Sequence, residues 1–388
     1  MNTQELNTTE TDLPNTFENL RTDELLLNMG PQHPSTHGVL RVVIKTDGEI
    51  VKTATPEIGY LHRCFEKHSE NVDYIAVSPY VDRLDYLASM NNSMGYAIAV
   101  EKLISVEVPR RAEYIRVIIS ELQRIASHLM SFGTYGLDMG AFTAFMYGFR
   151  DREMILDIFE KISGARLLYN YMWIGGTYRD ITPELVDEIK KFLDYFKPKV
   201  EEYNNLLTYN QIFIERTKNI GIVDLKMCHT YGLTGVMLRG AGMKFDLRKN
   251  APYSIYKEVE FDVPVGTGQM GTLGDCWDRH IVRMKEMIQS IRIIEQLIDG
   301  IPEGPHRGKV GKVIKPPAGE AYSRTECPRG ELGFYIISDG TGKPYRVRCK
   351  SPCFMNVALL DELSRGVMVA DLVATIGSLD IVLGEVDR

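Results

Sequence analysis

Hydrophobic residues recur at helical spacing through the middle of the chain. After Pro109, apolar residues recur at offsets of 3, 4, 7, 10, 11, 14 and 15 from Ile115, namely at Ile118, Ile119, Leu122, Ile125, Ala126, Leu129 and Met130. This spacing places them on one face of an amphipathic helix. Pro109 suits the first turn of that helix, and we expect Gly133 and Gly136 to end it.

Four other segments share the helical pattern. They run from about residue 82 to a break before Pro109, from Asp138 to about Gly164, from about Pro183 to Thr217 and from about Asp275 to Ile298. Asp138 can serve as an N-cap that accepts hydrogen bonds from the first backbone N–H groups of its helix. Five long helices predict a helical bundle as the core of the molecule.

The two ends of the chain have a different pattern. Residues 25–60 predict strands, including a hairpin that turns at Thr46-Asp47-Gly48. After Pro302, glycines and prolines predict strands and loops, with one short helix near residues 356–366. The fold class is therefore α+β, with a central bundle of long helices between two strand-containing ends. We divide the chain into a flexible N-terminal arm (1–20), a β-rich subdomain (21–75), the bundle (76–300) and a C-terminal strand and loop region packed on the bundle (301–388).

Composition narrows the possible functions. The 388 residues are 44% hydrophobic and 25% charged, as in a globular protein, and a formal net charge of −7 argues against nucleic acid as a ligand. No apolar run approaches the roughly 18 residues of a membrane span, and the polar, acidic N-terminus predicts no cleaved secretory signal. Six cysteines without a C-x-x-C pair predict reduced, mostly buried thiols and no metal or iron–sulfur site in this chain.

A loop before the predicted hairpin can hold a histidine in one orientation. It contains GPQHPSTHG at residues 30–38, where prolines and glycines restrict the backbone around His33 and His37. An imidazole, the Tyr86 phenol and the Asp138 carboxylate form a set suited to proton-coupled reduction of a carbonyl compound. From the residues alone, plainer roles stay open. The histidines can satisfy loop carbonyls, Tyr86 can belong to the bundle core, and Asp138 can be only a helix cap.

The stretch HRCFEKH at residues 62–68 carries an arginine of interest. Arg63 can stay charged near an anionic cofactor, and its alternative role is a salt bridge with Glu66 or Glu70. Cys64 stands alone, so we expect it to behave as a small buried hydrophobe.

Two further stretches have an unusual composition. Residues 139–149 (MGAFTAFMYGF) are rich in methionine and aromatic residues, and we expect them to form bundle core. Residues 343–354 (KPYRVRCKSPCF) are locally basic, which predicts a solvated strand edge, with a docking surface as the alternative.

Four motifs, taken in order, resemble one protein family. GPQHPSTHGVLR, IGYLHRCFEK, DRLDYLASM and the C-terminal SLDIVLGEVDR resemble the 49-kDa-type (D-type) subunit of NADH–quinone oxidoreductase, the respiratory complex I. The resemblance extends from about Leu26 to Arg388. It implies a fold shared with the large subunit of NiFe hydrogenases, and a peripheral place in the hydrophilic arm on the cytoplasmic side of the bacterial inner membrane.

The resemblance also implies a function and partners. Family members form a quinone cavity with a neighbouring small iron–sulfur subunit, whose terminal 4Fe–4S cluster reduces the quinone, and hold no cofactor alone. Other implied partners are the 30-kDa-type (C-type) subunit, a ferredoxin-like iron–sulfur subunit and the membrane subunit that forms the quinone channel. The implied activity is proton-translocating NADH:quinone oxidoreduction, which this chain supports only within the complex.

Family roles carry over to four positions. Tyr86 matches the tyrosine that hydrogen-bonds a quinone carbonyl, His37 the histidine that contacts the headgroup, and Asp138 the aspartate paired with that histidine. Arg63 matches the arginine that lies against the terminal cluster, and His33 supports the loop. Donors aimed at the carbonyl oxygens stabilise the reduced quinone and can pass it protons. Loss of the His37 proton would leave Asp138 unpaired, which we expect to couple reduction to proton translocation.

The sequence departs from the family pattern in two ways. The hydrogenase relatives bind nickel and iron through two C-x-x-C pairs, of which only Cys64 remains near the N-terminus and none at the C-terminus, so a nickel site is excluded. Many family members carry a histidine just after GAR, where this chain has Leu168. Without that donor the cluster is harder to reduce, which predicts a low-potential substrate, menaquinone rather than ubiquinone.

Three other functions stay open. The chain could serve a related complex fed by ferredoxin or another donor, since this subunit does not touch the electron input site. A membrane-bound NiFe hydrogenase large subunit is disfavoured by the missing cysteines. A non-redox scaffold that only docks the iron–sulfur subunit would tolerate substitution of Tyr86.

Overall fold

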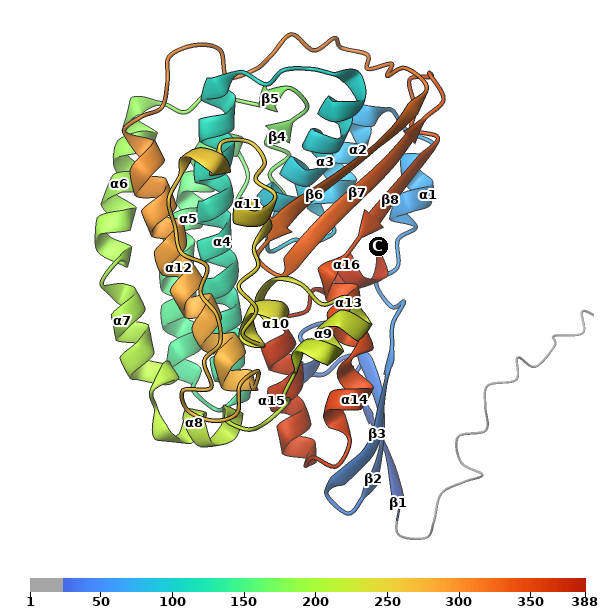
Figure 1. Cartoon of the computed structure of the whole chain (residues 1–388), viewed down its shortest axis with the longest axis vertical. Helices are drawn as coiled ribbons and strands as arrows, with labels where there is room; N and C mark the ends of the chain where they lie inside the picture. The colour runs from blue at the N-terminus through green and yellow to red at the C-terminus, as the bar shows by residue number, and fades with distance from the viewer. Residues whose placement is uncertain (1–23) are drawn as a thin grey trace, which may run out of the picture.

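The structure is a computed structural model, which describes residues 24–388 (Figure 1). The predicted arm over residues 1–20 lies outside the described range. The centre of the molecule is α4 (Arg110–Asp138), a helix of 29 residues that packs against α3, α5, α12 and α15. Mixed helices and small sheets confirm the predicted α+β class.

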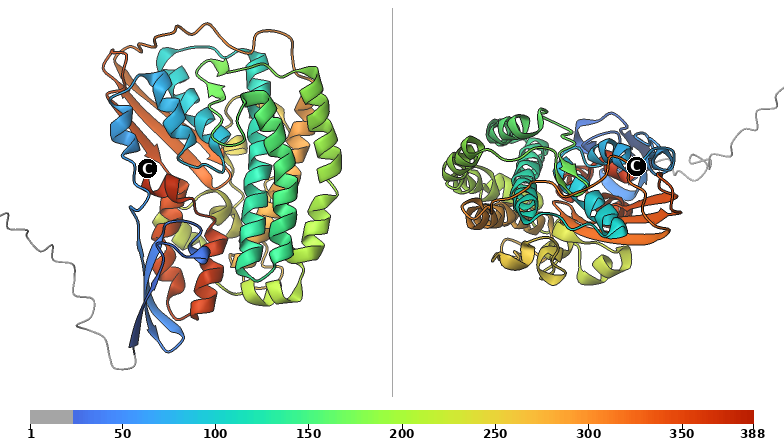
Figure 2. Two further views of the ribbon diagram at one scale, coloured as in Figure 1. Left: turned by 180° about the vertical axis from the view of Figure 1, so that it is seen from behind. Right: turned by 90° about the horizontal axis from the view of Figure 1, so that it is seen from above.

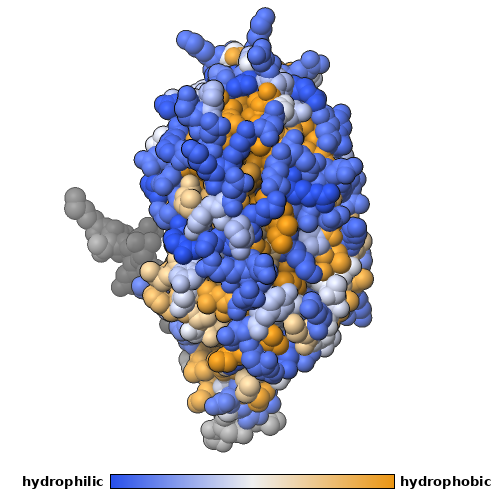
Figure 3. Space-filling model, turned by 90° about the vertical axis from the view of Figure 1, so that its left-hand side faces the viewer, coloured by the Kyte–Doolittle hydropathy of each residue, from blue (hydrophilic) through white to orange (hydrophobic). Residues whose placement is uncertain are grey.

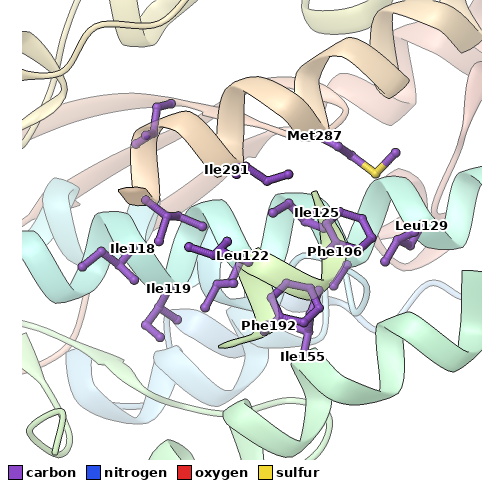
Figure 4. Packing of buried hydrophobic residues seen from close by; sticks show 14 of the residues in the cluster. Ile118, Ile119, Leu122, Ile125, Leu129, Ile155, Phe192, Phe196, Met287 and Ile291 are labelled. Atoms are coloured by element: carbon purple, nitrogen blue, oxygen red, sulfur yellow. The ribbon is translucent and has the colours of Figure 1, made fainter. Parts of the chain in front are cut away.

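The helical bundle surrounds an apolar core that α4 supplies along one face. Its helices are α3 (Ser89–Ile104), α4, α5 (Phe142–Ser163), α6 (Pro183–Phe196), α7 (Lys199–Tyr203), α8 (Gln211–Thr217) and α12 (Cys276–Ile298). Figure 4 shows the centre of this core, where α4 meets α5, α6 and α12 through Ile118, Ile119, Leu122, Ile125, Leu129, Ile155, Phe192, Phe196, Met287 and Ile291. The residues predicted from helical spacing are therefore core residues, except for Met130, which is half-buried.

Two three-stranded antiparallel sheets cover the other side of the bundle (Figures 1 and 2). The N-terminal sheet contains β1 (Glu24–Met29), β2 (Arg41–Asp47) and β3 (Ile50–Glu57). The predicted hairpin is confirmed, but its turn is Gly48-Glu49 rather than Thr46-Asp47-Gly48, because Thr46 and Asp47 still pair with β3. The second sheet contains β6 (Gly319–Cys327), β7 (Gly330–Ser338) and β8 (Arg346–Lys350), and it packs on α3. β8 is an edge strand, as predicted for the basic stretch at residues 343–354.

Short elements connect these layers. They are the 3-10 helix η1 (Pro34–Thr36), α1 (Phe65–Ser69), α2 (Tyr74–Asp82), β4 (Met172–Trp173), β5 (Gly176–Thr177), the π-helix η2 (Asn204–Thr208), α9 (Leu225–Tyr231), α10 (Gly235–Gly240), α11 (Leu247–Asn250) and the 3-10 helix η3 (Tyr256–Glu258). The C-terminal helices are α13 (Pro352–Ala358), α14 (Leu360–Ser364), α15 (Val369–Leu379) and α16 (Leu383–Asp387). The blue N-terminal sheet and the red C-terminal helices lie side by side in Figures 1 and 2 and share one apolar core.

The prediction that Gly133 and Gly136 end the central helix is wrong. Both glycines lie where α4 meets α5, and a Cβ atom on Gly136 would lie 2.9 Å from the Cβ of Ala144. A Cβ on Gly133 would lie 3.2 Å from the Cα of Phe145. The glycines therefore allow two helices to approach closely, which outweighs their low helix propensity. Asp138 is the last residue of α4, and Ala141 stands at the N-cap of α5 without a side-chain bond.

Two other helix predictions need correction. The helix expected over 183–217 is divided into α6, α7, the π-helix and α8, because Pro198 lacks a backbone N–H at the first break and Asn210 caps α8 at the last. The first bundle helix begins at Ser89 rather than near residue 82. Asp82 instead ends α2.

The C-terminal region holds more helix than the one short segment expected near 356–366. Four helices lie between Pro352 and Asp387. Among them, α15 runs for 11 residues through a stretch that contains Gly377. Its glycine and small residues weaken the sequence signal, and its packing against α4 stabilises it.

Residues 139–149 are bundle core only in part: Ala144 belongs to the core, and Met139 and Tyr147 pack against it. Ala144 and Gly148 face α4, so that the side chains of Phe142 and Met146 are 60% and 52% exposed. Both lie on the first two turns of α5. The view from the α6–α7 side shows polar side chains over much of the upper half and hydrophobic ones more often in the lower half (Figure 3).

Candidate functional site

A cavity of about 870 Å³ lies where four segments meet. These segments are the loop between β1 and β2, the turn between α2 and α3, the C-terminal part of α4 and residues 380–382 after α15. Much of its wall is apolar and includes Val39, Leu87, Met130, Ile381 and Val382. His33, His37, Tyr86 and Asp138, which the sequence predicts to act together, all line it.

Local hydrogen bonds fix the histidine loop. His33 stands at the N-cap of η1, where its Nδ1 accepts a hydrogen bond of 3.2 Å from the backbone N–H of Ser35. The buried Thr36 hydroxyl lies 2.7 Å from the carbonyl oxygen of His33 and 2.9 Å from that of Gly38. His37 closes the turn in the left-handed conformation, with φ of 54°. The loop therefore presents the His37 ring from a constrained backbone.

His37 forms an ion pair with Asp138 at the end of α4. Its Nε2 contacts Asp138 Oδ2, and the two side chains are only 12% and 7% exposed. A carboxylate in this position accepts a hydrogen bond from the Nε2–H form of the ring. Gly377 of α15 lies against this pair, because a Cβ on Gly377 would be 2.7 Å from Asp138 Oδ2.

Tyr86 lies in the turn between α2 and α3 rather than on a bundle helix. Asp85 shapes this turn by accepting a hydrogen bond of 3.1 Å from the backbone N–H of Leu87. Burial, and secondly the negative charge of Asp85, raise the pKa of Tyr86 above its usual range, so the phenol stays protonated. None of the described residues hydrogen-bonds its hydroxyl, which leaves this donor available to a ligand in the cavity.

Arg63 lies at the exposed surface beside the Tyr86 turn, outside the cavity wall. Its guanidinium donates a hydrogen bond to the carbonyl of Arg83, and burial followed by the charge of Arg83 lowers its pKa. The alternative salt bridge is not formed, because Glu66 and Glu70 pair with Arg346 at 2.8 and 3.0 Å.

Cys64 is exposed, contrary to the expectation of a buried thiol. It stands at the N-cap of α1 in the left-handed conformation, with φ of 54°. The other five cysteines are buried and reduced. No group of three or more metal-ligating side chains occurs in residues 24–388.

Sequence reasoning missed the charged groups behind the cavity wall. Arg329, in the turn between β6 and β7, bonds Asp85 at 2.8 Å and Asp380 at 3.2 Å. Asp380 stands inside the motif SLDIVLGEVDR, so its position offered a signal. Arg329 follows no helical or strand periodicity that could have marked it.

The cavity combines an apolar wall with a phenol and an imidazole paired to a carboxylate. Such a site suits a hydrophobic compound whose carbonyl oxygens take up protons. Among residues 24–388, no helix is long and apolar enough to cross a membrane. The chain is thus a mixed α+β protein whose largely apolar cavity is lined by a phenol and by an imidazole paired with a carboxylate.

Comparison with known proteins identifies the family. The family described as "Respiratory-chain NADH dehydrogenase, 49 Kd subunit" matches residues 138–315 and 306–388. The D-type subunit of NADH-quinone oxidoreductase from Chlorobium luteolum is 56% identical over 375 residues, which cover 96% of this chain and 95% of that protein. The same subunits of Chlorobaculum tepidum and Pelodictyon phaeoclathratiforme are 55% and 56% identical, each over 96% of this chain and 94% of their own length. The chain belongs to the 49-kDa-type subunit family of NADH–quinone oxidoreductase, which confirms the resemblance, and is one component of an oxidoreductase complex.

Proposed function

We propose that the 870 Å³ cavity is this chain's part of the site where the complex reduces quinone. The observation that supports this most is the convergence of Tyr86 and the His37–Asp138 pair on one largely apolar cavity. The three residues lie in distant parts of the sequence. Apolar walls suit a quinone ring and its isoprenoid tail, and the two donors suit its two carbonyl oxygens.

Tyr86 and His37 act as the proton donors. Reduction to quinol adds two electrons and two protons, and negative charge develops on both carbonyl oxygens. The Tyr86 hydroxyl and the protonated His37 ring stabilise that charge by hydrogen bonding and can each transfer a proton. His33 supports the loop by capping η1, which keeps the His37 backbone in place.

Asp138 couples proton transfer to a conformational change of the complex. While His37 is protonated, the pair is a buried ion pair, and transfer of its proton to quinone leaves a carboxylate that faces a neutral ring. An unpaired buried charge is costly. We propose that the relief of this unpaired charge drives the rearrangement that proton translocation by the complex requires.

Arg63 belongs to the environment of the terminal 4Fe–4S cluster of the neighbouring small iron–sulfur subunit, which supplies electrons. Arg63 and Arg83 place two positive charges side by side at an exposed surface next to the Tyr86 turn. This surface suits an anionic cluster across an interface. The other partners are the 30-kDa-type subunit, the ferredoxin-like iron–sulfur subunit and the membrane subunit of the quinone channel. The complex places this chain peripherally, on the cytoplasmic side of the inner membrane.

The native substrate is menaquinone. Leu168, with an aliphatic half-buried side chain, occupies the position at which many relatives carry a histidine. A side chain that cannot donate a proton or a hydrogen bond cannot stabilise the reduced cluster. We therefore expect a low cluster potential, matched to a low-potential quinone. Redox titration of the cluster by electron paramagnetic resonance tests this, and a potential as high as in ubiquinone-using relatives would contradict it.

Filling the cavity tests the site directly. Val39→Trp places a large side chain in the wall, and Val313→Trp is a matched control at a position that is 67% exposed. In the assembled complex, we expect Val39→Trp to abolish quinone reduction by NADH and to leave ferricyanide reduction, which samples the upstream flavin, unchanged. The control should keep both activities. Full quinone reduction by assembled Val39→Trp complex would contradict the proposed site.

A further inference from the structure

Arg329 joins three walls of the cavity without lining it. It stands in the turn of the β6–β7 hairpin, which extends into the middle of the molecule (Figure 1), and only 2% of its surface is exposed. Its Nη1 lies 2.8 Å from Asp85 Oδ2 and 2.9 Å from the Ser127 hydroxyl. Its Nε donates a bond of 2.9 Å to the Asp380 carbonyl, and its Nη2 donates one of 3.2 Å to Asp380 Oδ1.

Each partner of Arg329 belongs to a different segment of the cavity. Asp85 directly precedes Tyr86 in the turn between α2 and α3. Ser127 lies one helical turn before Met130, which lines the cavity from α4. Asp380 lies in the wall and leads to Ile381 and Val382. Arg329 is therefore a single side chain that fixes the relative positions of three separate segments.

The chemistry of these contacts requires arginine. The planar guanidinium directs several N–H groups at fixed angles, so one residue can bond two carboxylates, a hydroxyl and a carbonyl together. Asp85 and Asp380 are buried carboxylates that this cation neutralises. A lysine would keep the charge and lose the fixed fork.

We infer that Arg329 is a positioning residue for quinone reduction, which holds the Tyr86 hydroxyl at the headgroup by fastening the Tyr86 turn to α4 and to the segment after α15. This role rests on the proposed quinone site. Arg329 acts through Asp85 and touches neither the cavity nor the substrate. Its contribution is to keep a donor in one place, and a displacement of about 1 Å can cost about 100-fold in rate.

The test uses Arg329→Lys in the assembled complex, alone and combined with Tyr86→Phe. In the otherwise native complex, we expect quinone kcat/KM to fall about 10- to 100-fold, the effect of losing one charged hydrogen bond, with ferricyanide reduction unchanged. In the Tyr86→Phe background, we expect Arg329→Lys to cause no further loss, because the hydroxyl that it positions is absent. A merely structural arginine would cause equal losses in both backgrounds, and that result would overturn the role.

Two further variants keep the test decisive. Arg248→Lys changes another fully buried arginine, which bonds Asp246 and Glu121 away from the cavity, and we expect it to lower stability without changing the KM for quinone. Ser127→Ala removes one bond of Arg329 and is the substitute if Arg329→Lys complex does not assemble. We expect it to raise the KM several-fold only when Tyr86 is present, and an equal effect in both backgrounds would overturn the inference. Full quinone reduction by Tyr86→Phe complex would instead contradict the proposed function itself.

Discussion

Gly377→Ala should impair quinone reduction without removing any chemical group. Gly377 lies on α15, and a Cβ atom added there would meet Asp138 Oδ2 at 2.7 Å and the Tyr135 ring at 2.7 Å. Ordinary contacts of a Cβ begin near 3.4 Å. Either the carboxylate and the Tyr135 ring, or α15 itself, must therefore move by about 0.7 Å, the difference between these two distances.

The displaced carboxylate is the one that His37 contacts. Overpacking of this kind costs about 1–3 kcal/mol, and a charged hydrogen bond contributes about 1.5–3 kcal/mol. We expect loss of about half of that bond, about 0.8–1.5 kcal/mol, which corresponds to a roughly 4- to 12-fold lower quinone kcat/KM. Because the upstream electron path does not include Asp138, the rate from NADH to ferricyanide should not change.

The assay compares the two rates in membranes that hold equal amounts of assembled complex. Gly300→Ala is the matched control, since a Cβ there would meet no atom closer than 3.8 Å, and it should keep both rates. Quinone kcat/KM at the native level in assembled Gly377→Ala complex would refute the claim that α15 holds Asp138 in place for His37.

Three other perturbations test separate parts of the account. Asp138→Asn should lower the number of protons translocated per electron, measured in reconstituted vesicles, and an unchanged ratio would count against coupling through this carboxylate. Arg63→Leu should lower the midpoint potential of the terminal cluster, since a nearby cation favours the reduced, more negative state; redox titration showing no shift would exclude that role. Burial, and secondly the charge of Asp85, raise the pKa of Glu385 to about 7. The folded chain therefore binds this proton more tightly than the unfolded chain, and the free energy of unfolding falls as pH rises from about 4.5 to 7. Glu385→Gln should remove that dependence and stabilise the complex above pH 7 by at most about 3 kcal/mol, and equal thermal stability of both forms at pH 8 would contradict it.

The helical core could be predicted because burial imposes a period on the sequence. Ile118 and Leu122 of α4 follow that period and lie in the core. Helix ends were harder to predict, because a glycine such as Gly136 can either end a helix or allow two helices to pack closely. Only the position of Ala144 across the contact decides between these roles.

The site was predicted through the family resemblance and could not have come from spacing alone. Tyr86, His37 and Asp138 are separated by up to 101 positions, and nothing in local sequence brings them to one cavity. Arg329 shows the limit most clearly. It acts at long range from a hairpin turn, and its role depends on partners in three other segments.

The central claim is that the Tyr86 hydroxyl serves the quinone in this cavity. Tyr86→Phe removes that oxygen alone, and Tyr345→Phe is a matched control at a position that is 65% exposed. The measurement is the ratio of NADH–quinone to NADH–ferricyanide activity in assembled complex. The account predicts that this ratio falls about 10- to 100-fold in Tyr86→Phe, to a residual rate that can still be measured, and does not fall in the control. An unchanged ratio in Tyr86→Phe would contradict it and would favour a scaffold that only docks the iron–sulfur subunit.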